Sequence, residues 1–131
     1  MKSEVIVPPR MRAIIEGAGY APAVRAGNLL FCAGQFGRDD DLNVIHDPEE
    51  QFEACWRNLD EVLSAAGCSF ADVVEMTTYH VEMSRYMDLF REVKNRFFPR
   101  RTCAWTRIGV SELAHHGLLV EIKAVALIPQ C

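Results

Sequence analysis

The sequence predicts an α+β fold in which a single mixed β-sheet carries two helices on one of its faces. Two segments, around residues 47–67 and 84–98, repeat apolar residues at the three- and four-residue spacing of amphipathic helices. Several shorter segments alternate apolar and polar residues or are rich in β-branched residues, as strands are. Their order along the chain is strands, helix, strand, helix and two strands. Because helices that connect the strands of one sheet pack against it, we expect both helices on the same face.

Length and composition indicate an ordinary globular protein, and we expect one domain over residues 1–131. The net charge of −4 argues against a nucleic-acid-binding surface, which usually carries a basic excess. No segment approaches the roughly 18 consecutive apolar residues of a membrane span. The first residues lack the apolar core of a signal peptide. We therefore expect a cytoplasmic protein whose partners include neither a membrane nor a nucleic acid.

The five cysteines are Cys32, Cys55, Cys68, Cys103 and Cys131. None forms a C-x-x-C pair, and no histidine stands beside them at ligand spacing, so no metal site is expected. Their odd number and scattered positions are typical of reduced thiols in a cytosolic protein. Cys32 and Cys55 are interpreted as small buried hydrophobic residues.

The N-terminal segments are expected to form one edge strand and two loops. Residues 1–10 are interpreted as a short edge strand that ends at Pro8-Pro9. Residues 13–21 contain two glycines and precede a proline, which indicates a loop. Residues 38–44 form a charged loop, in which three consecutive aspartates are expected to be solvated.

A hairpin is expected at residues 23–26 and 29–34, around the turn Gly27-Asn28. Its second strand ends at Gly34. A glycine at this position lets the backbone approach another group closely, so Gly34 is a candidate pocket residue. A bulge or a turn explains the same glycine equally well, and the sequence leaves both interpretations open.

The first helix has the clearest boundaries. Asp47 is the expected N-cap, Pro48 the first helical residue and Glu50 the third, which resembles a capping box. Gly67 is expected to end the helix in the left-handed conformation. The apolar stripe of this helix, interpreted as core, contains Phe52, Cys55, Trp56, Leu59, Val62, Leu63 and Ala66.

The second half of the chain begins with a β-branched run at residues 73–81, which predicts a strand. Ser84 is the expected cap of the second helix, which runs to about Phe98 and ends before Pro99. Two further strands follow, at residues 101–108 and 118–127. The loop at 109–117 separates them.

The last two strands carry the candidate site. If they pair antiparallel, one face is apolar and supports the helices, while the other face is mixed. A mixed face that holds a tryptophan and a cysteine suits a site at a subunit boundary, because these residues rarely face water. Arg101 and Glu121 are its candidate working pair; a salt bridge between them is the alternative. With period-two alternation, the mixed face contains Arg101, Cys103, Trp105, Arg107, Leu119, Glu121, Lys123 and Val125.

Several motifs resemble the RidA/YjgF family of reactive-intermediate deaminases, and they occur in the order typical of that family. The similarity extends from about Tyr20 to Leu127. The motifs lie at residues 27–35, 58–67, 72–74, 101–103 and 120–126. The resemblance implies a chorismate-mutase-like fold and a homotrimer with clefts between neighbouring subunits. It also implies hydrolysis of enamines and imines, such as 2-aminoacrylate, to 2-keto acids and ammonia without a cofactor.

The resemblance assigns roles to five residues. Arg101 binds the substrate carboxylate and Glu121 positions water, while Tyr20, Gly34 and Cys103 line the substrate site. Elementary chemistry agrees with the first two roles. A guanidinium group binds a carboxylate through two parallel hydrogen bonds, and an ionised carboxylate can orient and deprotonate water.

The sequence departs from the family pattern in ways that concern the substrate. Phe90 stands where an asparagine is common, Trp105 is unusually large for its position, and the 109–117 loop is longer than usual. Cys103 as a covalent nucleophile is disfavoured, because no histidine or aspartate stands at a spacing that would activate it.

Two other functions remain possible. The first is a regulatory trimer that binds a small carboxylate through Arg101 without turnover and does not need Glu121. The second is the RNA cleavage or translation inhibition reported for some relatives. The sequence lacks the aromatic residues interleaved with a basic stripe that RNA binding favours.

Overall fold

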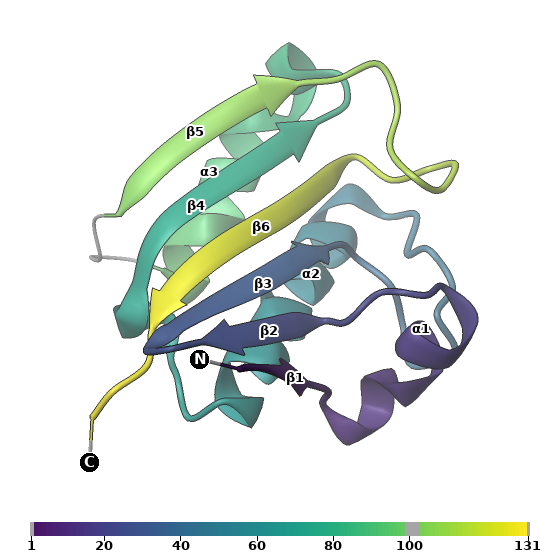
Figure 1. Ribbon diagram of the computed structural model, residues 1–131. Coiled ribbons are helices and arrows are strands. Elements are labelled where there is room, and N and C mark those ends of the chain that lie inside the picture. Colours follow the sequence, from purple (N-terminus) through teal and green to yellow (C-terminus); the bar gives the residue numbers. More distant parts are fainter. Residues whose placement is uncertain (1, 99–102, 131) are drawn as a thin grey trace.

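The computed structural model describes residues 2–98 and 103–130 (Figure 1). The sheet strands are β1 (Ser3–Ile6), β2 (Ala23–Ala26), β3 (Leu29–Gln35), β4 (Val73–His80), β5 (Ala104–Gly109) and β6 (Val120–Leu127). The helices are α1 (Arg12–Gly17), α2 (Pro48–Ala65) and α3 (Met83–Phe97), with two 3-10 turns, η1 (Pro9–Met11) and η2 (Phe70–Asp72).

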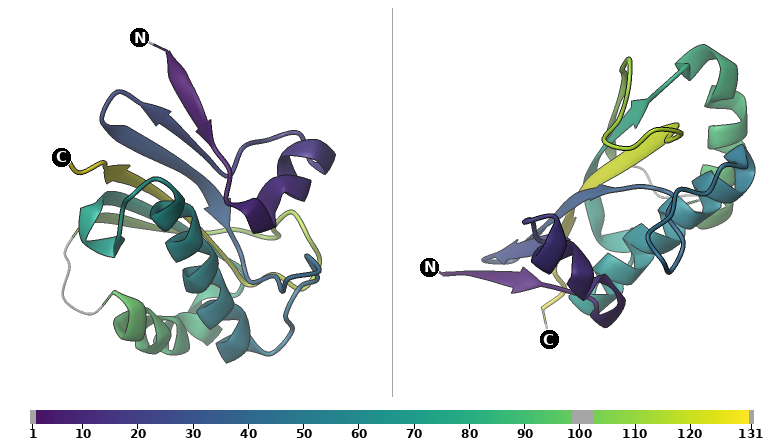
Figure 2. Two further views of the ribbon diagram at one scale, coloured as in Figure 1. Left: turned by 90° about the horizontal axis from the view of Figure 1, so that it is seen from below. Right: turned by 90° about the vertical axis from the view of Figure 1, so that its right-hand side faces the viewer.

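The six strands form one mixed sheet in the order β1-β2-β3-β6-β4-β5. Only β4 and β5 pair in parallel, whereas the other neighbours are antiparallel. Helices α2 and α3 lie side by side on one face of this sheet, as Figures 1 and 2 show. The predicted fold, a single mixed sheet with two helices on one face, is therefore confirmed.

Two surfaces of the sheet follow from strand register. The helix face carries the paired residues Ala23, Cys32, Ala124 and Met76, all of which are buried. The other face, called the open face below, carries a row of four paired apolar residues. This row runs across four strands and consists of Val5, Val24, Phe31 and Val125. The partners alternate in this way because side chains of adjacent residues point to opposite faces of a sheet.

The expected pairing of the last two strands is wrong. β5 pairs with β4 alone and lies at the sheet edge, whereas β6 lies between β3 and β4. The physical reason is the crossover through α3, which joins two parallel strands and leaves them as neighbours. The loop after β5 then returns the chain past β4 to β6 (Figure 1).

The expected mixed face is wrong for Trp105 and for Arg107, whose guanidinium group lies over the Trp105 ring. In the β4–β5 register Trp105 lies beside Met76, which is buried under the helices. The indole N–H of Trp105 donates a hydrogen bond to Thr78 Oγ1 at 2.9 Å, and its ring lies 6.3 Å from that of Phe90. Trp105 therefore faces α3, on the opposite side of the sheet from Glu121.

The N-terminal part confirms two expectations and overturns one. β1 is an edge strand, and β2 and β3 form the expected hairpin, in which Gly27 has a φ of +64°. The expected loop at 13–21 instead begins with helix α1. Met11 and Ile14 are buried in the main core, so tertiary burial stabilises a helix that is too short to be stable alone.

Both long helices form where the sequence predicts them. Asp47 caps α2, because its Oδ2 accepts the Glu50 N–H at 3.0 Å, and Gly67 beyond its end has a φ of +76°. Helix α3 begins one residue before the expected cap Ser84. Glu82 precedes it with a φ of +52° and no side-chain cap, so backbone conformation turns the chain out of β4.

Candidate functional site

Glu121 is the second residue of β6 and lies on the open face. Its neighbours Val120 and Ile122 are buried on the helix face, so strand alternation fixes its direction. In the register with β4 it lies opposite Tyr79, and Lys123 follows two residues later on the same face. The side chain is half-buried, although β6 lies in the interior of the sheet.

Gly34 lies directly against Glu121. Strand β3 shifts its register here: Cys32 pairs with Ala124 and Gln35 with Ile122, so β3 contains one extra residue. A Cβ atom added to Gly34 would lie 2.7 Å from both Cγ and Oε2 of Glu121, and nearer still to Cδ. The irregularity that the sequence left open as one interpretation is confirmed, and the backbone of Gly34 approaches Glu121 closely, while its place in a substrate pocket stays a prediction.

The electrostatic environment of Glu121 suits a group that exchanges protons. Burial raises the pKa of its carboxyl above the ordinary value, and the positive charge of Lys123 partly opposes this rise. Among the described residues, none hydrogen bonds or ion-pairs with the Glu121 carboxylate. A half-buried carboxylate of this kind is available to bind water and to accept a proton from it.

Tyr20 and Cys103, two other candidate site residues, lie in different surroundings from Glu121 and Gly34. Tyr20 is half-buried between α1 and β2, and two residues later Pro22 O accepts the Ala33 N–H at 2.9 Å. The Tyr20 segment is therefore joined to the residue that precedes Gly34. Cys103 is half-buried next to the start of β5, where it packs against the core and interacts electrostatically with Lys94. Arg101 lies outside the described residues.

Two buried polar side chains on the helix face had no role in the sequence prediction. His80 Nε2 lies 2.7 Å from Thr78 Oγ1, the same hydroxyl that accepts the Trp105 indole N–H. Burial, together with the positive charge of Arg107, lowers the pKa of His80 to about 4. This network therefore holds a neutral histidine beneath α3 and links β4 to β5.

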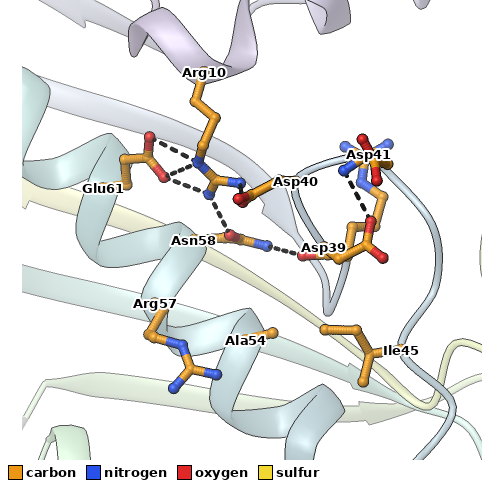
Figure 3. A pocket seen from close by; sticks show the side chains of 10 residues that line it. Arg10, Asp39, Asp40, Asp41, Ile45, Ala54, Arg57, Asn58 and Glu61 are labelled. Atoms are coloured by element: carbon orange, nitrogen blue, oxygen red, sulfur yellow. Dashed lines mark hydrogen bonds and ion pairs between the residues drawn. The ribbon is translucent and has the colours of Figure 1, made fainter.

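A first cavity, of about 640 Å³, lies at α2 and is lined by charged residues that pair with one another (Figure 3). Arg10 donates to the Asp40 carboxylate at 2.6 Å, to the amide oxygen of Asn58 at 2.9 Å and to the Glu61 carboxylate. Asp39 accepts two backbone N–H groups of its own loop at 2.9 Å. All three aspartates are exposed to solvent as expected, but Asp39 and Asp40 also make these specific contacts. The cluster ties the 38–44 loop to α2 and η1.

A second cavity, of about 530 Å³, lies within the loop that precedes β6. It extends from Val81 and Glu82 across residues 111–119. Its last lining residue, Leu119, stands two positions before Glu121. The long loop noted in the sequence thus borders the end of the sheet that carries the candidate carboxylate.

The described residues contain neither a candidate metal cluster nor a candidate membrane-spanning helix. Within residues 2–98 and 103–130, no three His, Cys, Asp or Glu side chains form a group that could hold a metal ion. No helix in the same ranges is long and apolar enough to cross a membrane. The thiols of Cys32, Cys55 and Cys68 are free and buried, as expected for the first two.

Known proteins are similar to this chain in sequence and in fold. The family model described as Endoribonuclease L-PSP matches residues 11–128. The RutC family protein YjgH of Escherichia coli is 37% identical over 112 residues, which cover 85% of this chain and 84% of that protein. A solved structure of YjgH has a TM-score of 0.91 at 32% identity, with complete coverage of both chains.

Relatives of lower sequence identity include a human deaminase and a mycobacterial protein. The human 2-iminobutanoate/2-iminopropanoate deaminase is 28% identical over 110 residues, covering 82% of this chain and 79% of that protein. A Mycobacterium tuberculosis structure, described as a member of the YjgF family, has a TM-score of 0.81 at 28% identity and covers 97% of this chain and all of its own. On the family model, the identity to YjgH and the shared fold, this chain belongs to the RidA/YjgF family.

Proposed function

We propose that this protein is an enamine and imine deaminase, a hydrolase that acts on C=N bonds. Its substrates would be reactive 2-imino acids, which it converts to 2-keto acids and ammonia without a cofactor. The observation that carries the proposal is the half-buried Glu121 carboxylate, held against Gly34 and unpaired among the described residues. The name of the human relative, a 2-iminobutanoate/2-iminopropanoate deaminase, supports the same chemistry.

The reaction requires one proton transfer to carbon and one addition of water. For 2-aminoacrylate, protonation of the methylene carbon by solvent gives the protonated imine. Water then attacks the C=N carbon and loses a proton to Glu121, which forms a carbinolamine. The protonated Glu121 returns this proton to the amine nitrogen, the C–N bond breaks as the hydroxyl group loses its proton to solvent, and ammonia and pyruvate are released. Glu121 thus serves as the base that activates water.

Substrate binding is proposed for the remaining predicted residues. An arginine binds a carboxylate through two parallel hydrogen bonds, so Arg101 is assigned to the substrate carboxylate. Tyr20, Gly34 and Cys103 are assigned to the walls of the site. Holding substrate and water in contact contributes much of the rate, because it replaces a bimolecular encounter by a fixed geometry.

We also propose a homotrimer in the cytoplasm, with each site shared between two subunits. The open face carries a row of apolar side chains across four strands, and Phe31 in this row is 45% exposed. Burial of such a surface is worth roughly 25 cal/mol per Å² before the costs of association. Closed symmetry covers the same face on every subunit. Because Glu121 lies on this face, a neighbouring chain would form the opposite wall of its site.

A regulatory trimer that binds a small carboxylate without turnover is the second candidate, and turnover itself distinguishes the two. We expect the protein to hydrolyse freshly generated 2-aminoacrylate, measured by ammonia release and by competition with semicarbazide. Glu121→Gln should lower kcat by about a hundredfold or more, because glutamine cannot accept the proton. Its affinity for pyruvate should change much less.

The matched control is Glu75→Gln, which removes an exposed carboxylate opposite Val125 on the same face. It should leave the rate unchanged. In the wild type, the rate should fall as pH decreases through the raised pKa of Glu121, because the protonated carboxyl cannot act as a base. A Glu121→Gln protein with the wild-type rate would contradict the proposed function and favour the regulatory trimer.

A further inference from the structure

Gln51 is a fully buried amide in the second turn of α2. Its side chain is 0% exposed and makes three hydrogen bonds to backbone groups of other segments. The Nε2 group donates to Ile45 O at 2.8 Å and to Gly117 O at 3.0 Å. The Oε1 atom accepts the Leu119 N–H at 2.7 Å.

One of the segments joined by Gln51 is the loop that follows β3. Gly37 in this loop packs directly on the helix, since an added Cβ would lie 2.9 Å from the Gln51 carbonyl carbon and nearer to its oxygen. Gly37 O also accepts the Ile45 N–H at 3.0 Å. The loop is thus fixed to Gln51 at both Gly37 and Ile45. Gly34, which contacts Glu121, stands only three residues before Gly37.

The other segment is the entrance to β6. Leu119 lies two residues before Glu121, and both of its backbone groups are held: its N–H by Gln51 and its C=O by the Val81 N–H at 2.9 Å. Gly117 O is held by the same Gln51 amide. Beyond the direct pairing of Gln35 with Ile122, the loop that leaves β3 and the segment that enters β6 are therefore connected through one side chain on the helix face.

We propose that Gln51 is a positioning residue, whose amide sets the end of β3 relative to the start of β6 and so holds the Glu121 carboxylate against Gly34. The kinetic part of this inference rests on the proposed deaminase function. Its structural part, the placement of Glu121, can be tested without any turnover.

The chemistry of the contact requires an amide. Two carbonyl oxygens need donors and one N–H needs an acceptor, and a neutral glutamine supplies both at a single position. A methionine keeps a similar length and volume but leaves all three backbone groups without partners. The resulting strain falls on the two strand ends that meet at Glu121 and Gly34.

The pKa of Glu121 reports its placement, because burial is the main reason that this pKa is raised. The charged and titratable groups around Glu121 are Lys123 on the same strand, Tyr79 opposite on β4 and the Cys55 thiol on α2. None of these groups changes in a Gln51 variant. If β6 loosens, water reaches the carboxyl and its pKa falls toward the ordinary value.

The experiment is a carbon-13 NMR titration of the Glu121 carboxyl in the wild type, in Gln51→Met and in a matched control, Asn58→Leu. Asn58 is a second buried amide of α2 that donates to Phe36 O at 2.8 Å. It holds the loop after β3 but makes no hydrogen bond to the entrance of β6. We expect the pKa of Glu121 to fall in Gln51→Met and to stay at the wild-type value in Asn58→Leu.

Kinetics gives the second readout on the same proteins. Gln51→Met should lower kcat for 2-aminoacrylate by about tenfold to a hundredfold with little change in KM, because misplacement by about an ångström costs rates of this size. In Gln51→Met, the acid limb of the pH–rate profile should move to lower pH together with the Glu121 pKa measured by NMR. An unchanged Glu121 pKa in folded Gln51→Met, or an equal fall in both variants, would overturn the positioning role.

Hydrogen exchange on the wild type provides a test that needs no variant. The Leu119 amide should exchange as slowly as the amides of Ile122 and Ala124 within β6, and rapid exchange would overturn the proposal. If the wild type does not hydrolyse 2-aminoacrylate, the proposed function fails. The titration and the exchange still decide whether Gln51 positions Glu121.

Discussion

Replacement of Gly34 by alanine should separate activity from stability. The new methyl group would lie 2.7 Å from Cγ and Oε2 of Glu121, which is too close for either atom to stay in place. The clash involves mostly the outer part of a flexible side chain, so Glu121 can rotate away. Overpacking in a rigid core costs about 1–3 kcal/mol, and relaxation here should reduce this cost to below about 1 kcal/mol. Alanine also reduces the freedom of the unfolded chain, which favours folding by about 0.4–1 kcal/mol.

The two effects on stability nearly cancel, so the Tm should shift by only a few degrees. Activity should respond far more strongly. A displacement of the carboxylate by an ångström or more is expected to lower kcat for 2-aminoacrylate by about a hundredfold.

The assay pairs thermal unfolding with turnover in the wild type, Gly34→Ala and the control Gly17→Ala. No atom lies within 4 Å of a Cβ added to Gly17, so the control should keep the wild-type kcat and show only the small stabilisation that alanine brings through the unfolded chain. A Gly34→Ala protein with wild-type kcat would refute the reasoning, because it would show that the Glu121–Gly34 contact has no part in the reaction. A large loss of stability would refute the claim that Glu121 can move aside.

Two further predictions concern packing. Phe31→Asp should convert the proposed trimer to monomers at micromolar concentration, because it places a charge in the apolar row of the open face. Native mass measurement checks this result, and Leu42→Asp, at an exposed loop position with a φ of +66°, is the control that should keep the assembly. Gly37→Ala should lower the free energy of unfolding by about 2 kcal/mol or more, because its methyl group meets the backbone of Gln51, which cannot rotate away. Denaturant unfolding measures the loss, and wild-type stability of Gly37→Ala would show that the loop is not fixed to α2 as the structure indicates.

Local signals in the sequence predicted the helices and the hairpin well. The cap of α2 at Asp47 and the turn at Gly27-Asn28 depend on residues only a few positions apart, so the sequence contains the whole interaction. Helix α1 was missed for the opposite reason. Its stability comes from Met11 and Ile14 in the main core, and the glycines that follow it indicated a loop.

Pairing between distant strands was the weaker part of the prediction. Alternation along β6 correctly directed Glu121 away from the apolar face, because that face is defined by buried neighbours on the same strand. Alternation along β5 has two solutions, and only the pairing with β4 selects one. The register of Trp105 beside Met76 turns Trp105 toward α3, which the sequence alone does not reveal.

Because Trp105 lies on the helix face, the apolar surface of the open face consists mostly of other residues than the sequence predicted. The predicted apolar residues of this face included Trp105 and Val125; only Val125 belongs to the observed row, whose other members come from β1, β2 and β3. This row begins at the sheet edge opposite β5 and ends at β6 in the interior. The argument for assembly therefore now depends mainly on other residues, and the variant that tests it is Phe31→Asp.

Gln51 shows why a site on one face of a sheet can depend on the other face. In the sequence it is one polar residue beside the apolar stripe of α2, and nothing local distinguishes it from a solvated side chain. Its three partners are backbone groups, which carry no residue-specific signal and lie up to 68 positions away. β3 and β6 pair directly only as far as Gln35 and Ile122 at this end, so the segments beyond that pair need another group to fix their relative placement across the helix face. An amide with both donors and an acceptor can do this from within the core. In this way Gln51 of α2 positions Glu121 on the open face.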